Sequence, residues 1–585
     1  MAKLMSRVIN SILVLNYINF NGLYVILISL IIVYVYIYCR RRYFSPLASA
    51  PLAPANHFLI KYFGMVPPPN DVEKTDSLSR FLILAGQDPS LSPISVCWSI
   101  IGTPLVLVNT LRGVKDVLID GQAKSKIKGE PPKIQRGNLI RLIQNLVFGG
   151  KSINNAVGEV SLSPSLNIEW RWRRHILLPP FQPKQLVPKL LPYVATRTGD
   201  LLQLFEKHAH SGKAIELDEL FMGLTMDVIN YYLYGRSELN YDIVGGRQNL
   251  KNEHHRLGLG FQSVEAWLPF GINKTNWAQR RYKPARDKLK EFIRDSLNYA
   301  LEDYTEDLKN YEKQGVSKNQ RSYRSVAACA FDSGSYKEDH IDLINDLLSL
   351  TFAGYDTTAH TLSFAFSELA RNPKLQDELF HQVRSVLGPP PVAPETITAE
   401  KLAKMPLVTA IYRETLRKYP AVVFIPVHVN KDVIVDGVVV PSNAEIWCNV
   451  RGIQMNPAIF PDPEKFDPTR WLKPQDKVKL TENNDNEVPQ QDNVFDNLNS
   501  SSSDDNNRTD SFITPEAQYN FPDLSFTLGQ HACLGKNLAI LELRTVIACV
   551  MNQFTCKLKE GLVIDTKVVL TTKPRYGVWV HFEQR

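Results

Sequence analysis

A single cysteine near the end of the chain lies between glycines, directly before an apolar helical pattern. The stretch is LSFTLGQHACLGKN, residues 524–537, and Leu534, Leu538 and Leu541 recur at helical spacing. Cys533 is therefore expected at or just before a helix N-terminus, where the helix dipole and free N–H groups stabilise a thiolate. A buried structural thiol is the alternative, and it is the commoner role of an isolated cysteine.

The glycines of this stretch limit what its backbone can approach. Gly529 and Gly535 suit a turn that comes close to a large flat object, against which Phe526 can also pack. A haem face is such an object, so the stretch is compatible with a haem-binding loop.

The N-terminal region carries a long apolar run. Residues 23–39 read LYVILISLIIVYVYIYC without a charge, and three arginines follow at residues 40–42. Roughly 20 helical residues cross the hydrocarbon core of a bilayer, and the bulky end of the run does not resemble a signal-peptide cleavage site. We expect a single-pass membrane anchor within residues 1–45, with a signal peptide or a buried helix as alternatives. The arginines place the bulk of the protein in the cytosol.

The rest of the chain, residues 46–585, is expected to form one large domain without internal repeats. A hydrophobic content of 44% permits a large core. Long helical patterns dominate, as in residues 339–371, which stop before an Asn-Pro pair. Residues 433–440, VIVDGVVV, predict a β-hairpin that turns at Asp436 and Gly437. The predicted fold class is mainly α with a minor β-sheet.

One segment inside this domain has a different composition. Residues 481–507 are rich in Asn, Asp and Ser. Such a segment cannot bury enough apolar area to offset the entropy lost on ordering. It is therefore expected to be a disordered surface insertion.

Cysteine content and net charge exclude some classes of protein. The seven cysteines are scattered without a CxxC pair, which argues against a disulfide scaffold and favours a reducing compartment. A net charge of +7 is mild for 585 residues and does not indicate a nucleic-acid partner.

A polar notch interrupts the long helical pattern at residues 353–358, Ala-Gly-Tyr-Asp-Thr-Thr. Glycine inside a helix costs about 1 kcal/mol relative to alanine, and threonine side chains can bond to carbonyls one turn earlier. A solvated helix face is one explanation. Leucines and a phenylalanine surround the notch along the same helix, which favours a polar site inside an apolar helix.

Two further patterns pair arginine with acidic or aromatic residues. Glu414 and Arg417 are three residues apart on one predicted helix face, and Arg470 follows in the sequence FDPTRW. Trp170 and Arg174 belong to WRWRRH, which on its own could be a basic helix face or a nucleic-acid surface.

These patterns occur in the order found in the cytochrome P-450 monooxygenases, and the resemblance covers nearly the whole chain after the N-terminal run. The sequence from Phe526 through Gly529, His531 and Cys533 to Gly535 resembles the haem-binding loop of that family. The resemblance implies the cytochrome P-450 fold and haem b with Cys533 as the axial iron ligand. His531 stands where the family usually has a propionate-binding arginine, and histidine is fully charged only when protonated.

The resemblance also implies roles for the other patterns. Asp356 and Thr357 would relay protons to dioxygen, and Ala353 and Gly354 would contact the haem. Glu414, Arg417 and Arg470 would form a structural cluster beneath the haem. The implied donors to the haem propionates are Trp170, Arg174 and His428, and the implied apolar wall of the substrate pocket consists of Val422, Val423, Phe424 and Ile425.

The implied function is insertion of one oxygen atom from O2 into a lipophilic substrate. No dinucleotide fingerprint or flavin domain is visible, so electrons are expected from a separate NADPH-dependent flavoprotein reductase, with cytochrome b5 as a second candidate donor. The expected location is the endoplasmic reticulum membrane. Fatty acids, sterols, terpenoids and foreign lipophiles fit equally well. The alternatives are an isomerase or dehydratase of the same fold that does not use O2, and a non-enzymatic membrane protein with a structural cysteine.

Overall fold

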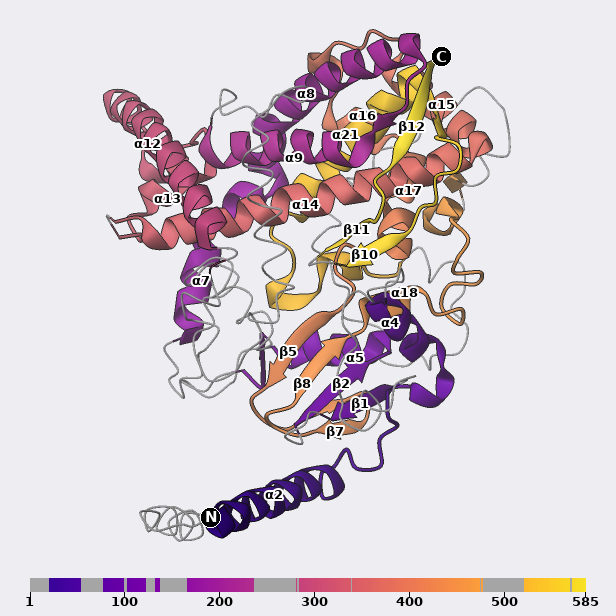
Figure 1. Cartoon of the computed structure of the whole chain (residues 1–585). Helices are drawn as coiled ribbons and strands as arrows, with labels where there is room; N and C mark the ends of the chain where they lie inside the picture. Colours follow the sequence, from indigo (N-terminus) through magenta and orange to yellow (C-terminus); the bar gives the residue numbers. More distant parts are fainter. Residues whose placement is uncertain are drawn as a thin grey trace.

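The structure is a computed structural model, and its described residues combine helices with four small sheets (Figure 1). It describes residues 20–53, 77–98, 103–122, 132–136, 166–235, 280, 283–337, 339–473, 475–476, 520–568 and 571–585, without the side chains of residues 20–26, 77, 166–170 and 319. The predicted insertion at residues 481–507 lies outside the described residues.

Helices make up most of the described chain, which confirms the predicted fold class. The α-helices are α2 (Phe20–Tyr43), α4 (Ser77–Gln87), α5 (Leu111–Lys115), α7 (Leu166–Leu177), α8 (Pro183–Ser211), α9 (Leu217–Tyr234), α12 (Lys283–Lys313), α13 (Val326–Ser333), α14 (Ile341–Arg371), α15 (Pro373–Leu387), α16 (Ala399–Ala403), α17 (Pro406–Lys418), α18 (Val450–Gln454) and α21 (Lys536–Gln553).

The strands form sheets of five, three, two and two members. The largest has the order β1 (Ile94–Trp98), β2 (Pro104–Val108), β8 (Glu445–Cys448), β5 (Ile425–Val429) and β3 (Ile134–Arg136), in which only β2 and β8 are parallel. The others are β4 (Ile215–Glu216) with β12 (Trp579–Gln584) and β9 (Phe554–Leu558), β10 (Thr566–Val568) with β11 (Thr572–Pro574), and β6 (Val433–Val435) with β7 (Val438–Val440).

Helix α14 crosses the middle of the molecule, with α8 and α9 on one side and the five-stranded sheet on the other (Figure 1). Its apolar side chains are buried on more than one face, as expected of a helix in the centre of a large core. The helix ends at Arg371, as predicted from the sequence. Asn372 then caps α15 by accepting a hydrogen bond from the Leu375 N–H at 3.2 Å.

The predicted hairpin is confirmed by strands β6 and β7, in which Val433 pairs with Val440 and Val435 with Val438. Asp436 and Gly437 form the turn with φ angles of 47° and 81°. Both residues are left-handed, as a two-residue hairpin turn of this kind requires.

Helix α2 contains the apolar run near the N-terminus, and its large apolar side chains from Leu27 to Ile37 are exposed. It extends away from the rest of the molecule (Figure 1). In the described parts of the chain, no helix combines the length and the hydropathy needed to cross a membrane.

Candidate active site

Cys533 lies in a loop that runs from Phe521 to Gly535 and that we call the cysteine loop. The loop contains the short helical turns η11 (Leu524–Phe526) and η12 (Gly529–His531), and α21 follows it directly. The Cys533 N–H donates to the Phe526 carbonyl at 2.8 Å and closes the loop. The predicted position of Cys533 just before a helix N-terminus is therefore confirmed.

Opposing effects act on the Cys533 thiol. Cys533 is exposed on one side, but the protein atoms packed around its sulfur reduce hydration and raise its pKa, while backbone N–H groups of Gly535 and Lys536 and the positive charges of Arg174 and Lys536 lower it. The net result is a pKa above the ordinary value. A metal cation bound to sulfur reverses such a balance, because it stabilises the thiolate directly.

The cysteine loop is anchored by Asp523. Its carboxylate pairs with Arg413 Nε of α17 at 3.1 Å and with Lys536 Nζ of α21 at 3.0 Å. Burial alone would raise the pKa of Asp523, but the two cations hold it below its usual value. The Ser525 hydroxyl also donates to the Leu416 carbonyl at 3.1 Å. These contacts attach the first part of the loop to α17 and to the first residue of α21.

Gly529 is required by a close contact within the protein. Its φ is +72°, and a Cβ added there would lie 2.1 Å from the Leu118 carbonyl oxygen. One close approach is therefore to the backbone of η3 (Asp116–Asp120), and the predicted approach to a flat ligand stays a prediction. Gly535 has no such neighbour among the described residues, because apart from its own chain neighbours none of them comes within 4 Å of a Cβ built on it. In the described part of the chain, Gly535 therefore leaves room beside the loop.

The variant Gly529→Ala is expected to lose more stability than Gly561→Ala. Both glycines have positive φ, at +72° and +75°, but only Gly529 has a clash. The left-handed conformation costs an L-residue about 1–2 kcal/mol in both variants, and overpacking adds about 1–3 kcal/mol at position 529. Urea unfolding of the two variants measures the difference. Equal losses would contradict the proposed clash with Leu118.

Helix α7 connects the cysteine loop to α14 through two consecutive arginines. Arg174 Nη2 donates to the Ala532 carbonyl at 2.9 Å. Arg173 is fully buried and pairs with Asp346 at 2.8 Å and Asp342 at 2.9 Å on α14. Burial lowers the pKa of Arg174, and the nearby Cys533 partly opposes this effect. The side chain of Trp170 lies outside the described part of the chain, so only its position in α7 is known.

The polar notch in α14 has the back-bonded threonines that the sequence predicts. The Thr357 hydroxyl donates to the Ala353 carbonyl at 3.0 Å, and the Thr361 hydroxyl donates to the Thr357 carbonyl at 2.8 Å. Ala353 is exposed and Thr357 half-buried, although Phe352, Tyr355, Thr358 and Ala359 nearby are buried. One face of the notch is thus open in the middle of an otherwise buried helix.

Gly354 does not belong to that open face. A Cβ added to Gly354 would lie 2.7 Å from Ile229 Cγ1 on α9. The glycine therefore permits close packing of α14 against α9, while its contact with a haem stays a prediction. Sequence reasoning missed this because Ile229 is distant in the chain.

Asp356 is held by two side chains that the sequence reading did not single out. His360 Nε2 lies 3.2 Å from Asp356 Oδ1, and the Thr571 hydroxyl donates to Asp356 Oδ2. His360 Nδ1 lies 2.7 Å from Asp218 Oδ1 at the start of α9. Burial would raise the pKa of Asp356, but His360, Thr571 and Lys573 bring it below its usual value. A histidine four residues after Asp356 on one helix was a signal in the sequence.

Glu414 is the centre of a buried cluster, which we call the Glu414 cluster. Arg417 donates to both of its oxygens at 2.9 Å, the Trp471 indole donates at 2.8 Å, and Arg470 Nε lies 3.5 Å away. Glu414 and Arg417 are completely buried, and Arg470 is nearly so. The structure thus brings together the three residues that the sequence separates by 56 positions, and Trp471 joins them.

A comparison with protein-family models places this geometry in a known family. The cytochrome P450 model matches residues 95–579, which include the cysteine loop, the polar notch and the Glu414 cluster. The chain belongs to the cytochrome P450 family. It is therefore a cytochrome P450 monooxygenase, an oxidoreductase whose family uses haem with a cysteine thiolate ligand.

Curated P450 proteins are similar to the chain at low identity. Cytochrome P450 3A6 of Oryctolagus cuniculus is 24% identical over 74% of this chain and 80% of its own length. Cytochrome P450 3A12 of Canis lupus familiaris is 25% identical over 74% and 79%. The mitochondrial sterol 26-hydroxylase of Homo sapiens is 25% identical over 66% and 64%. Both mitochondrial and other P450 proteins are thus among the relatives.

The residues around Cys533 fit the haem of a P450. Cys533 supplies a sulfur donor that faces accessible space, and Gly535 keeps the adjacent side free of protein atoms. Ala353 presents an accessible small side chain on α14, which packs against α21. Arg174 supplies a half-buried cation that is bonded to the Ala532 carbonyl of the cysteine loop. Phe526 is buried, and His531 is half-buried within the loop.

The predicted propionate donor His428 lies on β5 of this P450. Its Nδ1 is 2.8 Å from Glu445 Oε1, and the two residues are paired across β5 and β8. The sequence reading missed Glu445. The contact between Glu445 and Nδ1 orients the imidazole of His428, so the direction of the second ring nitrogen, Nε2, is fixed as well.

The predicted substrate wall of the P450 divides into two parts. Val422 is 39% exposed, whereas Val423 is only 3% exposed and belongs to a small core cluster. Phe424 stacks on Trp447 with ring centroids 3.8 Å apart, and Ile425 is half-buried at the start of β5. Val423 is thus buried in a core cluster, and its place in the wall of the substrate pocket stays a prediction.

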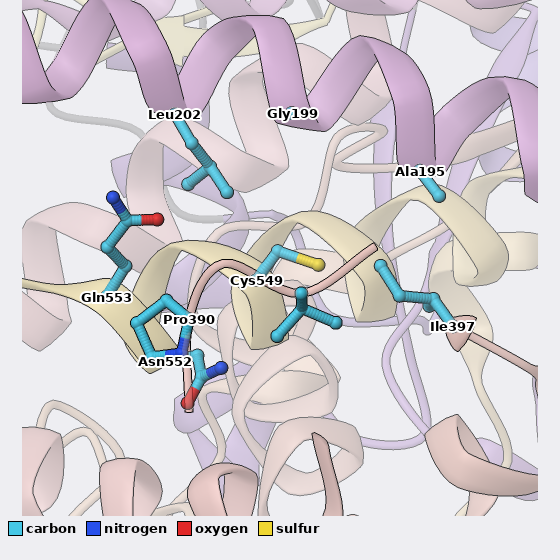
Figure 2. A pocket seen from close by; sticks show the side chains of 9 residues that line it. Ala195, Gly199, Leu202, Pro390, Ile397, Cys549, Asn552 and Gln553 are labelled. Carbon is cyan, nitrogen blue, oxygen red and sulfur yellow. The ribbon is translucent and has the colours of Figure 1, made fainter. Parts of the chain in front are cut away.

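A small pocket lies between α8, α21 and the segment that contains Pro390 (Figure 2). Its lining includes Cys549, a buried thiol whose burial raises its pKa to about 12. Cys549 is 13 residues beyond the start of α21, about 20 Å along the helix at 1.5 Å per residue. The pocket is therefore separate from the site around Cys533.

Proposed function

We propose that this P450 inserts one oxygen atom from O2 into a lipophilic substrate, with Cys533 as the iron ligand of haem b. The main support is the position of Cys533, which combines a closed loop, two backbone N–H groups aimed at sulfur and the nearby Arg174. When bound, haem supplies the redox chemistry that activates dioxygen, and the thiolate favours O–O cleavage.

The residues of the chain would hold the haem and move protons beside it. Arg174, His531, His428 and Trp170 would bind the propionates, and the accessible Ala353 would lie against the macrocycle. Thr357 and Asp356 would deliver protons on the α14 side, where Thr357 is half-buried and its hydroxyl is held by the Ala353 carbonyl. Glu414, Arg417 and Arg470 would keep the fold around the site rigid.

The substrate is proposed to be apolar. Val422 and Ile425 are accessible or half-buried near the start of β5, while Phe424 is fixed by its stack on Trp447. An apolar wall with few polar groups selects lipophilic molecules. Sterols, fatty acids and terpenoids all meet this requirement, and the name of the sterol 26-hydroxylase relative agrees with the first of them.

Electrons are proposed to come from NADPH through a separate flavoprotein reductase, with cytochrome b5 as a second candidate donor. We also propose that α2 attaches the protein to the endoplasmic reticulum membrane, with the catalytic domain, residues 46–585, in the cytosol. The exposed apolar side chains from Leu27 to Ile37 and the basic end of α2 support this attachment.

Reductase-dependent oxygen uptake tests the proposed function. The haem-loaded protein is mixed with an NADPH reductase and a panel of sterols, fatty acids and terpenoids. We expect at least one compound to increase oxygen uptake and to yield a product containing one atom of labelled oxygen. Conversion of a compound without oxygen uptake would instead indicate an isomerase or dehydratase and would refute the proposal.

The same preparation tests membrane attachment. The double variant Ile31→Lys and Val35→Lys places two charges one helical turn apart in α2, where both residues are exposed. We expect it to lose flotation with phospholipid vesicles while its absorption spectrum stays unchanged. Flotation equal to that of the natural protein would contradict attachment through α2.

A further inference from the structure

We propose that His360 is a positioning residue for oxygen activation, because it fixes the orientation and the charge of Asp356 from the interior of the domain. The inference rests on the proposed function, in which Asp356 takes part in proton delivery. It adds His360, which positions Asp356, and a second carboxylate, Asp218, which positions His360.

His360 bridges two carboxylates on different helices. Its Nδ1 lies 2.7 Å from Asp218 on α9, and its Nε2 lies 3.2 Å from Asp356 one turn earlier on α14. The imidazole is only 2% exposed. With an acceptor at each ring nitrogen, the doubly protonated imidazolium is the form that can donate to both carboxylates. The geometry therefore suits a buried cation between two anions.

The surroundings of His360 support a charged imidazole. The Ser363 hydroxyl donates to the same Asp218 oxygen at 2.8 Å. This contact favours the ionised form of Asp218, which accepts a hydrogen bond from His360. On the other side, Thr571 donates to Asp356, and Lys573 of β11 adds positive charge near it. Although burial lowers the pKa of His360, Asp218 and Asp356 together raise it to about 10.

Both oxygens of Asp356 are thus occupied, one by His360 and one by Thr571. Asp356 is held ionised, and each of its oxygens keeps one further acceptor site while these two contacts fix the direction of the carboxylate. His360 thereby determines the direction and the ionised form that the Asp356 carboxylate has before proton delivery. Thr357, the adjacent residue, is bonded to its own helix and makes no such contact with His360.

The test compares His360→Gln with Asp218→Asn and Thr571→Val in the haem-loaded full-length protein. Glutamine can still donate a hydrogen bond to Asp356 but carries no charge, so the pKa of Asp356 should rise. We expect His360→Gln to move the acidic limb of coupled turnover to higher pH and to increase the fraction of electrons released as peroxide. Asp218→Asn should shift the limb in the same direction by less. Thr571→Val should also increase the fraction of electrons released as peroxide. It should shift the acidic limb of the pH profile by less than His360→Gln does, because it removes no charge.

A second measurement does not depend on turnover. Because His360 has a raised pKa in the folded protein, its ion pairs stabilise the fold fully below about pH 6.5, and this stabilisation is lost as pH rises toward about 10. The unfolding free energy of the natural protein minus that of Asp218→Asn should therefore fall across this pH window. This comparison remains informative if His360→Gln fails to fold.

The outcomes separate this inference from the proposed function. An unchanged pH profile and unchanged coupling in His360→Gln would overturn the role of His360. A stability difference that is flat from pH 6.5 to 10 would do the same. Failure of the protein to give a thiolate-type spectrum with carbon monoxide would instead refute the proposed function, whatever the behaviour of His360.

Discussion

Serine at position 533 is expected to abolish the thiolate-type absorption of the reduced protein with carbon monoxide, together with all oxygen-dependent turnover. A serine hydroxyl is a harder and far less acidic donor than a thiol, so it does not replace the thiolate on iron. The hydrogen bond from the residue 533 N–H to Phe526 is made by the backbone and is kept. The loss should therefore be one of ligation and not of folding.

The matched control is Cys329→Ser on α13. Cys329 is half-buried and its pKa is raised chiefly by burial, yet it lies far from the cysteine loop in the chain. This variant should keep the spectrum and the bound haem of the natural protein. A thiolate-type spectrum retained in Cys533→Ser would show that another residue ligates the iron.

Replacement of Arg417 by methionine is expected to lower the free energy of unfolding by about 3–5 kcal/mol, because it leaves Glu414 with an uncompensated buried charge. Arg417 also donates to the carbonyls of Gln454 at 3.0 Å and Pro463 at 2.8 Å. Methionine fills a similar volume but cannot donate to any of these acceptors. Arg470 and Trp471 remain beside Glu414 and offset only part of the loss.

The control for this effect is Lys374→Met, which removes the cation of a surface ion pair. Lys374 is 88% exposed and lies 3.9 Å from Glu378. Its replacement should change stability by less than about 1 kcal/mol. Guanidinium unfolding curves of the two variants, recorded at one pH, give the comparison. A similar small change in both variants would mean that the Glu414 cluster does not stabilise the fold.

Local rules predicted the parts of the structure that depend on neighbouring residues. The end of α14 before Asn372, the hairpin turn at Asp436 and Gly437, and Cys533 before a helix N-terminus all follow from capping and turn preferences within a few residues. These features are confirmed because little competes with them from elsewhere in the chain.

Contacts between distant segments could not be predicted in this way. Gly354 packs closely against Ile229 on α9, and Gly529 packs against the Leu118 carbonyl, and neither contact was foreseen from the sequence. His360 depends on Asp218, which lies 142 residues earlier. In each of these three cases, the contact is made with a residue that is distant in the chain and that no local sequence pattern reveals.

The two consecutive arginines of α7 have a consequence for how the site can move. Arg173 forms an ion pair with α14, and Arg174 donates to the backbone carbonyl beside Cys533. Helix α7 therefore connects α14 to the cysteine loop. If α14 tilts, either the buried ion pair of Arg173 breaks or α7 moves together with α14. Breaking the buried ion pair costs more free energy, so α7 is expected to move with α14. A movement of α14 should therefore be accompanied by a movement of the cysteine loop in the same direction. The distance between α14 and the loop then stays nearly constant while both shift relative to the rest of the domain.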